Sequence, residues 1–268
     1  MSLIELKHIS FTYPDGTEAL RDVTLTIPGG GKIAFLGENG SGKSTLFLIL
    51  NGINRITGGE YYFQGEKIRY KKEQITRLIR SIGIVFQDPD IQIFASSVFQ
   101  EISFGPKNMG LTDSEAGRRV ECAMEKTDLS LFRDRPPHFL SYGEKKRVAI
   151  ADILAVDPPV IILDEPMAWL DIPHKKKIRE ILENLSKNSK TVIVSTHDPD
   201  FAFSWADHVY IMKNGAVLGQ GDPVEIFMDS GLLAGAGLEV PRVIELARKL
   251  KLKKIPRGWE ELLAEIGG

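Results

Sequence analysis

The chain has 268 residues, of which 43% are hydrophobic and 26% charged, and its formal net charge at pH 7 is −2. This composition can supply a sizeable core and differs from that of disordered chains. A dedicated nucleic-acid binder normally carries a surplus of basic residues, so we expect no nucleic-acid partner. The single cysteine, Cys122, can close no intrachain disulfide, which favours a reducing cytosolic compartment.

Apolar runs in the sequence are short. The longest, such as 82–86 and 160–163, have the length of strands, whereas a membrane-spanning helix needs ~20 apolar residues. The first residues do not show the basic flank and apolar stretch of a secretory signal. We therefore expect any role at a membrane to depend on a partner protein.

The first part of the chain is predicted to contain strands and one glycine-rich turn. Residues 3–9 and 19–27 have β-type patterns, and in the second of these apolar and polar residues alternate. Residues 32–36 form an apolar run that leads into a glycine-rich turn, after which a helix is expected to begin at about Lys43. Strand, glycine turn and helix in this order are typical of a phosphate-binding unit.

Three later runs, 82–86, 160–163 and 191–195, are also predicted strands, and helical stretches separate them. Alternation of strands and helices predicts a mostly parallel sheet covered by helices. The dipeptide at 214–215 is Asn-Gly, which between two short apolar runs predicts a type I′ hairpin.

A change of pattern after Gly221 predicts a domain boundary. Short helices follow, including one over 243–250. We predict a main α/β domain over residues 1–221 and a small, mainly helical C-terminal extension over 222–268, which would support a dimer or regulate the main domain.

The glycine-rich turn fits the phosphate-binding pattern G-x-x-x-x-G-K-[ST]. Its glycines would let backbone N–H groups face phosphate oxygens at a helix N-terminus. Lys43 would meet the β- and γ-phosphates, and the Ser44 hydroxyl would bind Mg²⁺. The predicted ATP-binding residues of this loop are Gly37, Glu38, Asn39, Gly40, Ser41, Gly42, Lys43, Ser44 and Thr45.

Two carboxylates follow the apolar strand 160–163 and complete a nucleotide site. Asp164 would hold Mg²⁺ through its hydration shell, and Glu165 would polarise the attacking water. Ordinary surface acids at a strand end are the alternative, and the phosphate-binding loop makes that alternative weak. The two motifs predict MgATP as substrate, with Mg²⁺ as cofactor.

Further segments resemble those of ATP-binding-cassette (ABC) ATPases, and with the two motifs they cover residues 1 to about 220. They are the signature loop at Ser141, Tyr142, Gly143 and Glu144, the Q-loop Gln87, the D-loop Asp171, the switch His197 and the adenine-stacking Tyr13. Taken singly, each has an ordinary structural explanation, such as a helix N-cap at Ser141. Their order and spacing point to the family.

The resemblance implies a P-loop ABC-type α/β fold with a parallel core sheet, an antiparallel β subdomain and a helical subdomain. It also implies catalytic roles for Glu165, His197 and Gln87, with Gln87 as a further Mg²⁺ ligand, and a dimer in which each signature loop meets the ATP of the other subunit. This sequence departs from the family pattern in having Tyr142 for a glycine and Glu144 for a glutamine. Met167 and Trp169 stand where small residues precede the D-loop.

The segment after the Q-loop is similar to that of energy-coupling-factor (ECF) importer ATPases of the CbiO/EcfA kind. In that group the segment docks on a membrane scaffold (the T-component), while a separate membrane subunit binds the solute. The predicted docking residues are Asp90, Gln92, Ile93 and Phe94.

The resemblance implies a peripheral protein on the cytoplasmic face of the cell membrane, paired as a homodimer or with a paralogous ATPase. Cobalt is the expected cargo before nickel, with vitamin uptake as an alternative. The competing class is a soluble, non-transport ABC ATPase of the DNA-repair or chromosome-organising type. Such proteins carry long coiled-coil insertions, and the stretch from Lys43 to Ser141 lacks sustained heptads.

Overall fold

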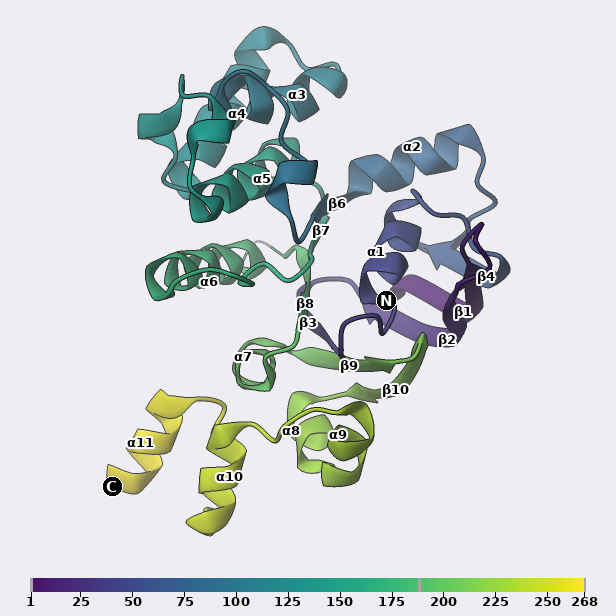
Figure 1. Cartoon of the computed structure of the whole chain (residues 1–268), viewed down its shortest axis with the longest axis vertical. Coiled ribbons are helices and arrows are strands. Elements are labelled where there is room, and N and C mark those ends of the chain that lie inside the picture. The colour runs from purple at the N-terminus through teal and green to yellow at the C-terminus, as the bar shows by residue number, and fades with distance from the viewer. Residues whose placement is uncertain (1, 188, 268) are drawn as a thin grey trace. The chain divides into compact units, whose positions relative to one another are not determined.

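The computed structural model describes residues 2–187 and 189–267, and most of its helices and strands are labelled in Figure 1. The chain folds into two compact units. The first unit comprises Met1–Ile49, Asn54–Arg69 and Ile193–Gly268, and the second comprises Leu50–Ile53 and Tyr70–Val192. The chain passes from the second unit back into the first within strand β8 (Thr191–Thr196).

The first unit contains an antiparallel sheet whose strand order is β2-β1-β4-β5. Its strands are β1 (Ser2–Thr12), β2 (Glu18–Pro28), β4 (Gly58–Phe63) and β5 (Glu66–Lys67). In β2, buried Val23, Leu25 and Ile27 alternate with exposed residues, because successive side chains of a strand point to opposite faces. One face of this sheet is therefore a core face.

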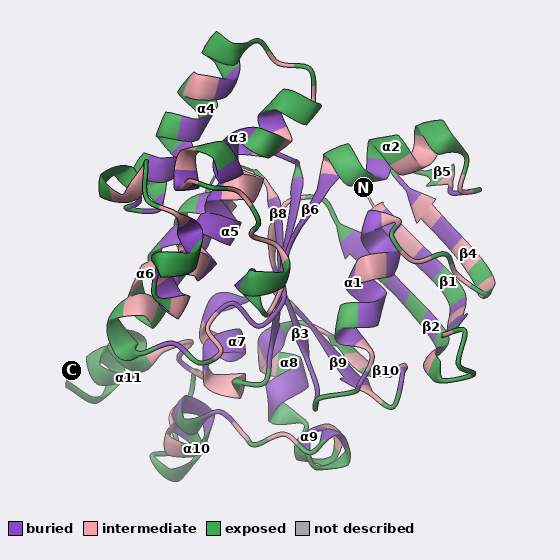
Figure 2. Ribbon diagram, turned by 45° about the horizontal axis from the view of Figure 1, so that its top comes forward, coloured by how far each residue is buried: buried purple, intermediate pink, exposed green. Residues whose placement is uncertain are grey.

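The same unit carries a second set of strands, in which β3 (Gly31–Leu36) pairs in parallel with β9 (His208–Lys213). β9 turns back into β10 (Ala216–Gly221) as an antiparallel hairpin. Asn214 and Gly215 both have positive φ angles, as a type I′ turn requires, so the predicted hairpin is confirmed. Figure 2 shows β3 and β9 as largely buried. Up to Gly221, the helices of this unit are α1 (Lys43–Asn51), whose last residues belong to the second unit, and α7 (Pro199–Trp205).

The second unit pairs β6 (Ile82–Val85) with β7 (Val160–Leu163) in parallel, and every residue of both strands is buried. Its helices are α2 (Lys72–Ser81), α3 (Val98–Asn108), α4 (Asp113–Lys126), α5 (Tyr142–Val156) and α6 (Ile172–Ser186). α3, α4 and α5 share one apolar core that includes Ile102, Val120 and Val148. Parallel strands with helical and antiparallel parts confirm the predicted fold class.

Beyond Gly221 the described residues form four helices within the first unit. They are α8 (Pro223–Met228), α9 (Ser230–Ala236), α10 (Arg242–Lys249) and α11 (Trp259–Gly267). Arg257, just before α11, donates from Nε to Phe203 O at 2.9 Å and from Nη2 to Ala206 O at 2.5 Å. The extension is thus tied to α7, and its assignment as a separate domain stays a prediction.

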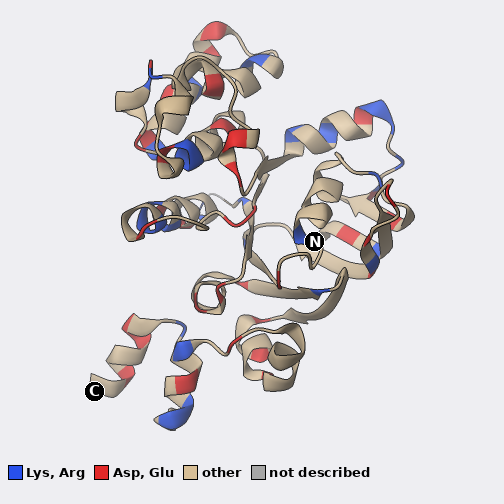
Figure 3. Ribbon diagram, viewed as in Figure 1, with Lys and Arg blue, Asp and Glu red and all other residues tan. Residues whose placement is uncertain are grey.

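Charge is mixed on the surface of this extension. Figure 3 shows both acidic and basic residues on the ribbon of α10, whose last turn carries Arg248 and Lys249 while its first turn carries Glu245. This distribution is typical of a solvated helix face. Among the described residues, no helix combines the length and the apolar character needed to cross a membrane.

Candidate nucleotide site

The phosphate-binding loop begins where β3 ends and finishes where α1 begins. Gly37 has a φ of +149°, and a Cβ there would lie 2.2 Å from Met212 O. Gly42 has a φ of +102°, and a Cβ there would lie 2.8 Å from Ala19 O. Both positions therefore demand glycine, and the loop keeps the backbone path that the sequence motif predicts.

Lys43 lies inside this loop and is only 6% exposed. Its Nζ donates to Gly37 O at 2.7 Å, to Glu38 O at 3.0 Å and to Ser41 Oγ at 3.3 Å. The ammonium is thus surrounded by the same loop whose N–H groups the motif assigns to phosphate oxygens. A phosphate in the loop would be met by a full positive charge already in place.

Tyr13 follows β1 and reaches the end of the phosphate-binding loop. Its Oη lies 2.9 Å from Thr45 Oγ1, and its ring meets Phe11 edge-on with centroids 4.8 Å apart. His197 is exposed directly after β8. The first unit therefore contains three predicted elements, and the structure joins two of them, Tyr13 and the loop, by a hydrogen bond.

The predicted carboxylates Asp164 and Glu165 lie in the second unit at the end of β7, and both are buried. Asp164 N–H donates to Val85 O at 2.9 Å, which fixes the start of the turn. Glu165 has a φ of +45°, a left-handed conformation that is strained for a residue with a side chain. Strain of this kind is characteristic of functional positions, where surrounding structure holds it.

Gln87 leaves β6 two residues after its last member, and its backbone is held by α5. The Gln87 carbonyl accepts hydrogen bonds from Tyr142 Oη at 2.9 Å and from Lys146 Nζ at 2.5 Å. The Q-loop and the helix that begins with the signature loop are therefore in direct contact within the second unit.

The signature loop begins α5 with a capping box. Glu144 N–H donates to Ser141 Oγ at 3.3 Å, while the Glu144 carboxylate accepts from Ser141 N–H at 2.8 Å and from the Ser141 hydroxyl at 2.9 Å. Partial burial acts to raise the pKa of Glu144, but the bonds from Ser141 together with the charges of Arg147 and Arg135 hold that pKa below its ordinary value. Glu144 thus stabilises the helix start in place of the family's glutamine.

The signature loop also contacts the D-loop. Gly143 is buried, and a Cβ there would lie 2.3 Å from the ring of His174. His174 in turn bonds Asp171, which is the N-cap of α6. The Tyr142 and Trp169 rings meet edge-on with centroids 5.9 Å apart. The unusual aromatic residues at these two positions therefore pack together.

Comparison with known proteins identifies the family. The sequence profile of the ABC transporter family matches residues 20–168, which is more than half of the chain. This chain belongs to the ABC transporter ATPases. Among curated relatives, the energy-coupling factor transporter ATP-binding protein EcfA of Methanocaldococcus jannaschii is 44% identical over 99% of this chain and 96% of its own length. A putative ABC transporter ATP-binding protein of Methanosarcina mazei is 42% identical over 96% of this chain, which spans only 57% of that relative.

Solved structures agree on the fold of the ABC ATPase. Cassette cbiO1 of Clostridium perfringens, described as part of the ABC transporter complex cbiONQ, has a TM-score of 0.78 and 40% identity, covering 94% of this chain and 99% of that one. A dimeric ATP-binding cassette bound to ADP and phosphate has a TM-score of 0.75 and 30% identity over 82% of this chain and 98% of that one. These comparisons confirm the family predicted from the sequence, including its ECF branch, and the ATPase activity that goes with it. The individual residue roles stay predictions.

The donors predicted for Mg²⁺ suit that ion chemically. The Ser44 hydroxyl, the Gln87 amide oxygen and the buried Asp164 carboxylate are all hard oxygen ligands, which Mg²⁺ prefers. Ser44 is on the first unit and the other two are on the second. When bound, Mg²⁺ would offset charge that develops on the phosphates.

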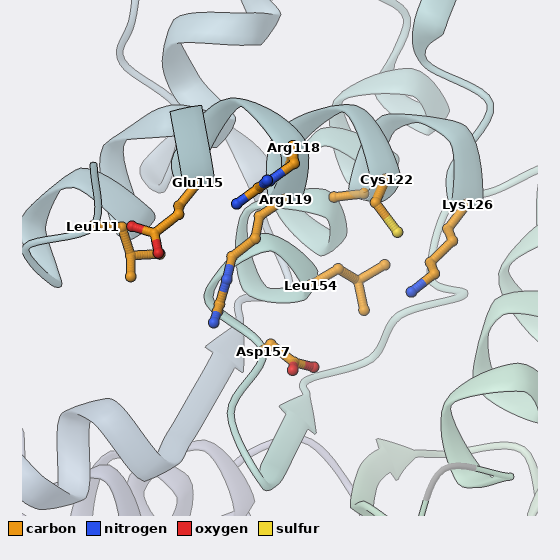
Figure 4. Close-up of a pocket in the computed structure, with 9 residues that line it drawn as sticks. Leu111, Glu115, Arg118, Arg119, Cys122, Lys126, Leu154 and Asp157 are labelled. Carbon is orange, nitrogen blue, oxygen red and sulfur yellow. The ribbon is translucent and has the colours of Figure 1, made fainter. Parts of the chain in front are cut away.

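A polar hollow of about 430 Å³ in the second unit is a separate feature, shown in Figure 4. Its lining residues come from α4, its flanks and the end of α5: Leu111, Glu115, Arg118, Arg119, Cys122, Ala123, Lys126, Leu154 and Asp157. Arg119 Nη1 already donates to Ala155 O and Val156 O, the last carbonyls of α5. None of the predicted ATP-site residues lines this hollow. The Arg119 guanidinium caps the C-terminus of α5.

Sequence reasoning missed Lys146, a charged side chain inside the core. It is 0% exposed and donates to Phe86 O as well as to Gln87 O. Burial lowers the pKa of Lys146 to about 8, although Asp164, Asp88 and Glu165 act in the opposite direction. In the sequence, Lys146 is the middle residue of the basic run 145–147. Such a run is ordinarily interpreted as a solvated helix face, so it gave no indication of a buried charge.

Proposed function

We propose that this ABC ATPase binds and hydrolyses MgATP to power an ECF-type importer, docked on the membrane scaffold protein through the surface beside its Q-loop. The observation that carries the proposal is an apolar groove of about 470 Å³ in the second unit. We call it the docking groove, and its lining residues are Asn51, Ile53, Thr76, Ile79, Arg80, Ile82, Gly83, Ile84, Phe86, Phe104, Gly105, Asn108, Met109, Ile153 and Val156.

Large apolar side chains lie exposed at and near this groove. Ile91 is 70% exposed, Phe94 66% and Phe104 51%. The rings of Phe94 and Phe104 meet edge-on with centroids 4.9 Å apart, which joins the segment after the Q-loop to the groove wall. Exposed apolar surface next to such a groove is characteristic of an interaction site, and aromatic anchors dominate such interfaces.

The four predicted docking residues divide into two kinds. Asp90 and Phe94 are exposed, whereas Gln92 and Ile93 hold the segment in place. The Gln92 side chain accepts from Phe86 N–H and donates to Ala149 O, each at 3.4 Å, and Ile93 packs on the core of α3, α4 and α5. Ile91, which the sequence prediction omitted, is a better contact candidate than Ile93.

The segment that holds the predicted docking residues, 90–94 (the docking segment), also forms an ion pair with α5 (the signature helix). Lys145 Nζ lies 2.6 Å from Asp90 Oδ1, and the Lys145 side chain is largely buried. In the proposed mechanism Lys43 binds the β- and γ-phosphates, Glu165 accepts a proton from the attacking water, and Ser141 and Gly143 meet the γ-phosphate held by a partner subunit. A movement of α5 on closing over ATP would then displace the docking segment.

For the cargo we propose cobalt before nickel. A separate membrane subunit would bind the cargo, and the ATP site of this chain would not contact it. The support is the resemblance to CbiO-type sequences, together with relatives named for energy-coupling factor transport. Vitamin uptake through a shared ECF module is the alternative that the transport assay distinguishes. The proposed location is the cytoplasmic face of the cell membrane.

The docking surface should be required for transport but not for ATP hydrolysis by the isolated ATPase. We expect Phe94→Ala combined with Ile91→Ala, at two exposed positions, to abolish most ATP-dependent cobalt uptake by vesicles that contain the ATPase with its scaffold and substrate-binding subunits. Loss of one aromatic anchor costs about 2 kcal/mol or more of binding. Basal ATP hydrolysis by the isolated ATPase, assayed without its membrane partners, should persist.

The matched control is Leu131→Ala, because Leu131 is an apolar side chain of the same unit that is 98% exposed. Its uptake should equal that of the wild type. Wild-type uptake by the double variant would assign the segment to core packing and remove the docking proposal. Uptake of a vitamin in place of cobalt would leave the importer in place and overturn the cargo, whereas failure to bind any scaffold would favour a soluble ABC ATPase.

ATP is expected to drive dimer formation when hydrolysis is blocked. In Glu165→Gln, MgATP should shift the protein from monomer to dimer in light scattering, with either itself or a paralogous ATPase as partner. Adding Ser141→Arg should prevent the shift, since a bulky cation replaces the hydroxyl at the start of α5. A monomer with full ATPase activity at every protein concentration would contradict the shared site.

A further inference from the structure

Two side chains of α5 converge on one main-chain carbonyl of the Q-loop. Tyr142 Oη and Lys146 Nζ both donate to Gln87 O, at 2.9 and 2.5 Å, and Lys146 also donates to Phe86 O at 3.1 Å. The two donors are four residues apart, which places them on the same face of the helix. The Q-loop is thus fastened to the signature helix at Gln87, the residue predicted to bind Mg²⁺.

The Lys146 ammonium is fully buried, and such burial is unfavourable unless the charge is compensated. Its compensation consists of two main-chain carbonyls and the field of Asp164, Asp88 and Glu165. An apolar side chain of similar length would fill this space without that desolvation cost. The ammonium, however, donates charged hydrogen bonds to the two Q-loop carbonyls, which an apolar side chain could not do.

Tyr142 is the residue that replaces a glycine of the family's signature pattern. Its ring is braced by Trp169, and its hydroxyl extends to the Q-loop. Burial, together with Asp88 and Asp90, raises the pKa of Tyr142, so the phenol stays a hydrogen-bond donor. The two aromatic residues that depart from the family pattern, Tyr142 and Trp169, thus pack together and place the Tyr142 hydroxyl for its hydrogen bond to Gln87 O.

We propose that Tyr142 and Lys146 are positioning residues that clamp the Gln87 carbonyl to the signature helix and thereby orient the Gln87 side chain for ATP hydrolysis. The inference rests on the proposed function, in which Gln87 acts at MgATP. Two donors on one carbonyl restrict rotation of the Gln87 peptide, and the amide side chain leaves from the same residue. When α5 moves, Gln87 must move with it.

A double-mutant cycle with Gln87→Ala tests this proposal on the full chain. The variants are Tyr142→Phe, which removes only the hydroxyl, and Lys146→Met, which removes only the ammonium. We expect kcat to fall about fivefold in Tyr142→Phe and about 10- to 100-fold in Lys146→Met, from the usual strengths of neutral and charged hydrogen bonds. KM for MgATP should change less than kcat, because the phosphate-binding loop is unaltered.

In the Gln87→Ala background the same two substitutions should lower kcat little further, because the side chain they orient is absent. Gln87→Ala keeps the main-chain carbonyl, so the clamp itself remains. Tyr62→Phe and Lys126→Met are the controls: the Tyr62 hydroxyl donates to Glu60 on the antiparallel sheet of the first unit, and Lys126 is exposed on α4. Neither should change kcat, and melting temperatures of all variants report folding.

Three results would overturn the clamp, and they are distinguishable. If Gln87→Ala lowers kcat while Tyr142→Phe and Lys146→Met do not, Gln87 acts as proposed but needs no clamp. If the two substitutions reduce kcat by the same factor with and without the Gln87 side chain, they act through the fold or another group. If Gln87→Ala itself has wild-type kcat, the proposed role of Gln87 fails and the clamp fails with it.

Discussion

Glu165→Gln is expected to abolish turnover while MgATP still binds. The substitution keeps the size of the side chain and the left-handed backbone at this position, where φ is +45°, and removes only the ability to accept a proton from water. General-base catalysis typically contributes ~10²- to 10⁴-fold, so kcat should fall by about that factor. Phosphate release measures kcat, and equilibrium binding of labelled ATP in the presence of Mg²⁺ measures affinity.

The control for this substitution is Glu125→Gln, at an exposed position of α4 in the same unit. It changes the net charge by the same amount and should leave both quantities at wild-type values. Loss of ATP binding in folded Glu165→Gln would contradict the role of a general base and would assign Glu165 to binding. Wild-type kcat would move the base to another residue altogether.

Sequence reasoning located the parts of the site that depend on local backbone demands. Gly37 and Gly42 occupy positive-φ positions that other residues cannot adopt without collision, so the pattern of glycines around Lys43 encodes the loop directly. The fully apolar strand 160–163 is likewise followed by two acidic residues, and strand β7 of the structure has the same limits, Val160–Leu163. Such features need only neighbours along the chain.

Features that depend on packing between distant segments were not predicted. Gly237 ends α9 in a left-handed conformation, which is a local demand, but its closeness to the phosphate-binding loop is not local: a Cβ there would lie 2.1 Å from Glu38 Oε1. Gln92 was predicted to face a partner and instead bonds Ala149 O, 57 residues further along the chain. Periodicity cannot show which polar side chain of a short segment will find a carbonyl inside the fold.

The signature helix illustrates the same limit. Tyr142 and Glu144 were recognised as departures from the family pattern, but their partners lie in three dimensions. Glu144 completes a capping box with Ser141, whose three-residue spacing is readable in the sequence. Tyr142 instead finds the Gln87 carbonyl, a contact over 55 residues that no spacing rule contains.

Lys43→Ala should weaken ATP binding while leaving AMP binding nearly unchanged. Lys43 is assigned to the β- and γ-phosphates, and AMP lacks both. Charged hydrogen bonds contribute about 1.5 to 3 kcal/mol each, so losing two of them predicts an ATP affinity lower by ~10²- to 10⁴-fold. Titration calorimetry with ATP and with AMP measures the two affinities on the same preparations.

The AMP comparison is needed because Lys43 also holds its own loop through Gly37 O and Glu38 O. If its role were only to keep the loop in shape, ATP and AMP should lose affinity by the same factor. Lys67→Ala is the matched control, since Lys67 pairs with Glu60 on the antiparallel sheet of the same unit. Selective loss for ATP in Lys43→Ala, with Lys67→Ala unchanged, would establish that the buried ammonium binds phosphate rather than supporting the loop. Equal losses would restrict Lys43 to a structural role and leave the phosphates to the backbone N–H groups.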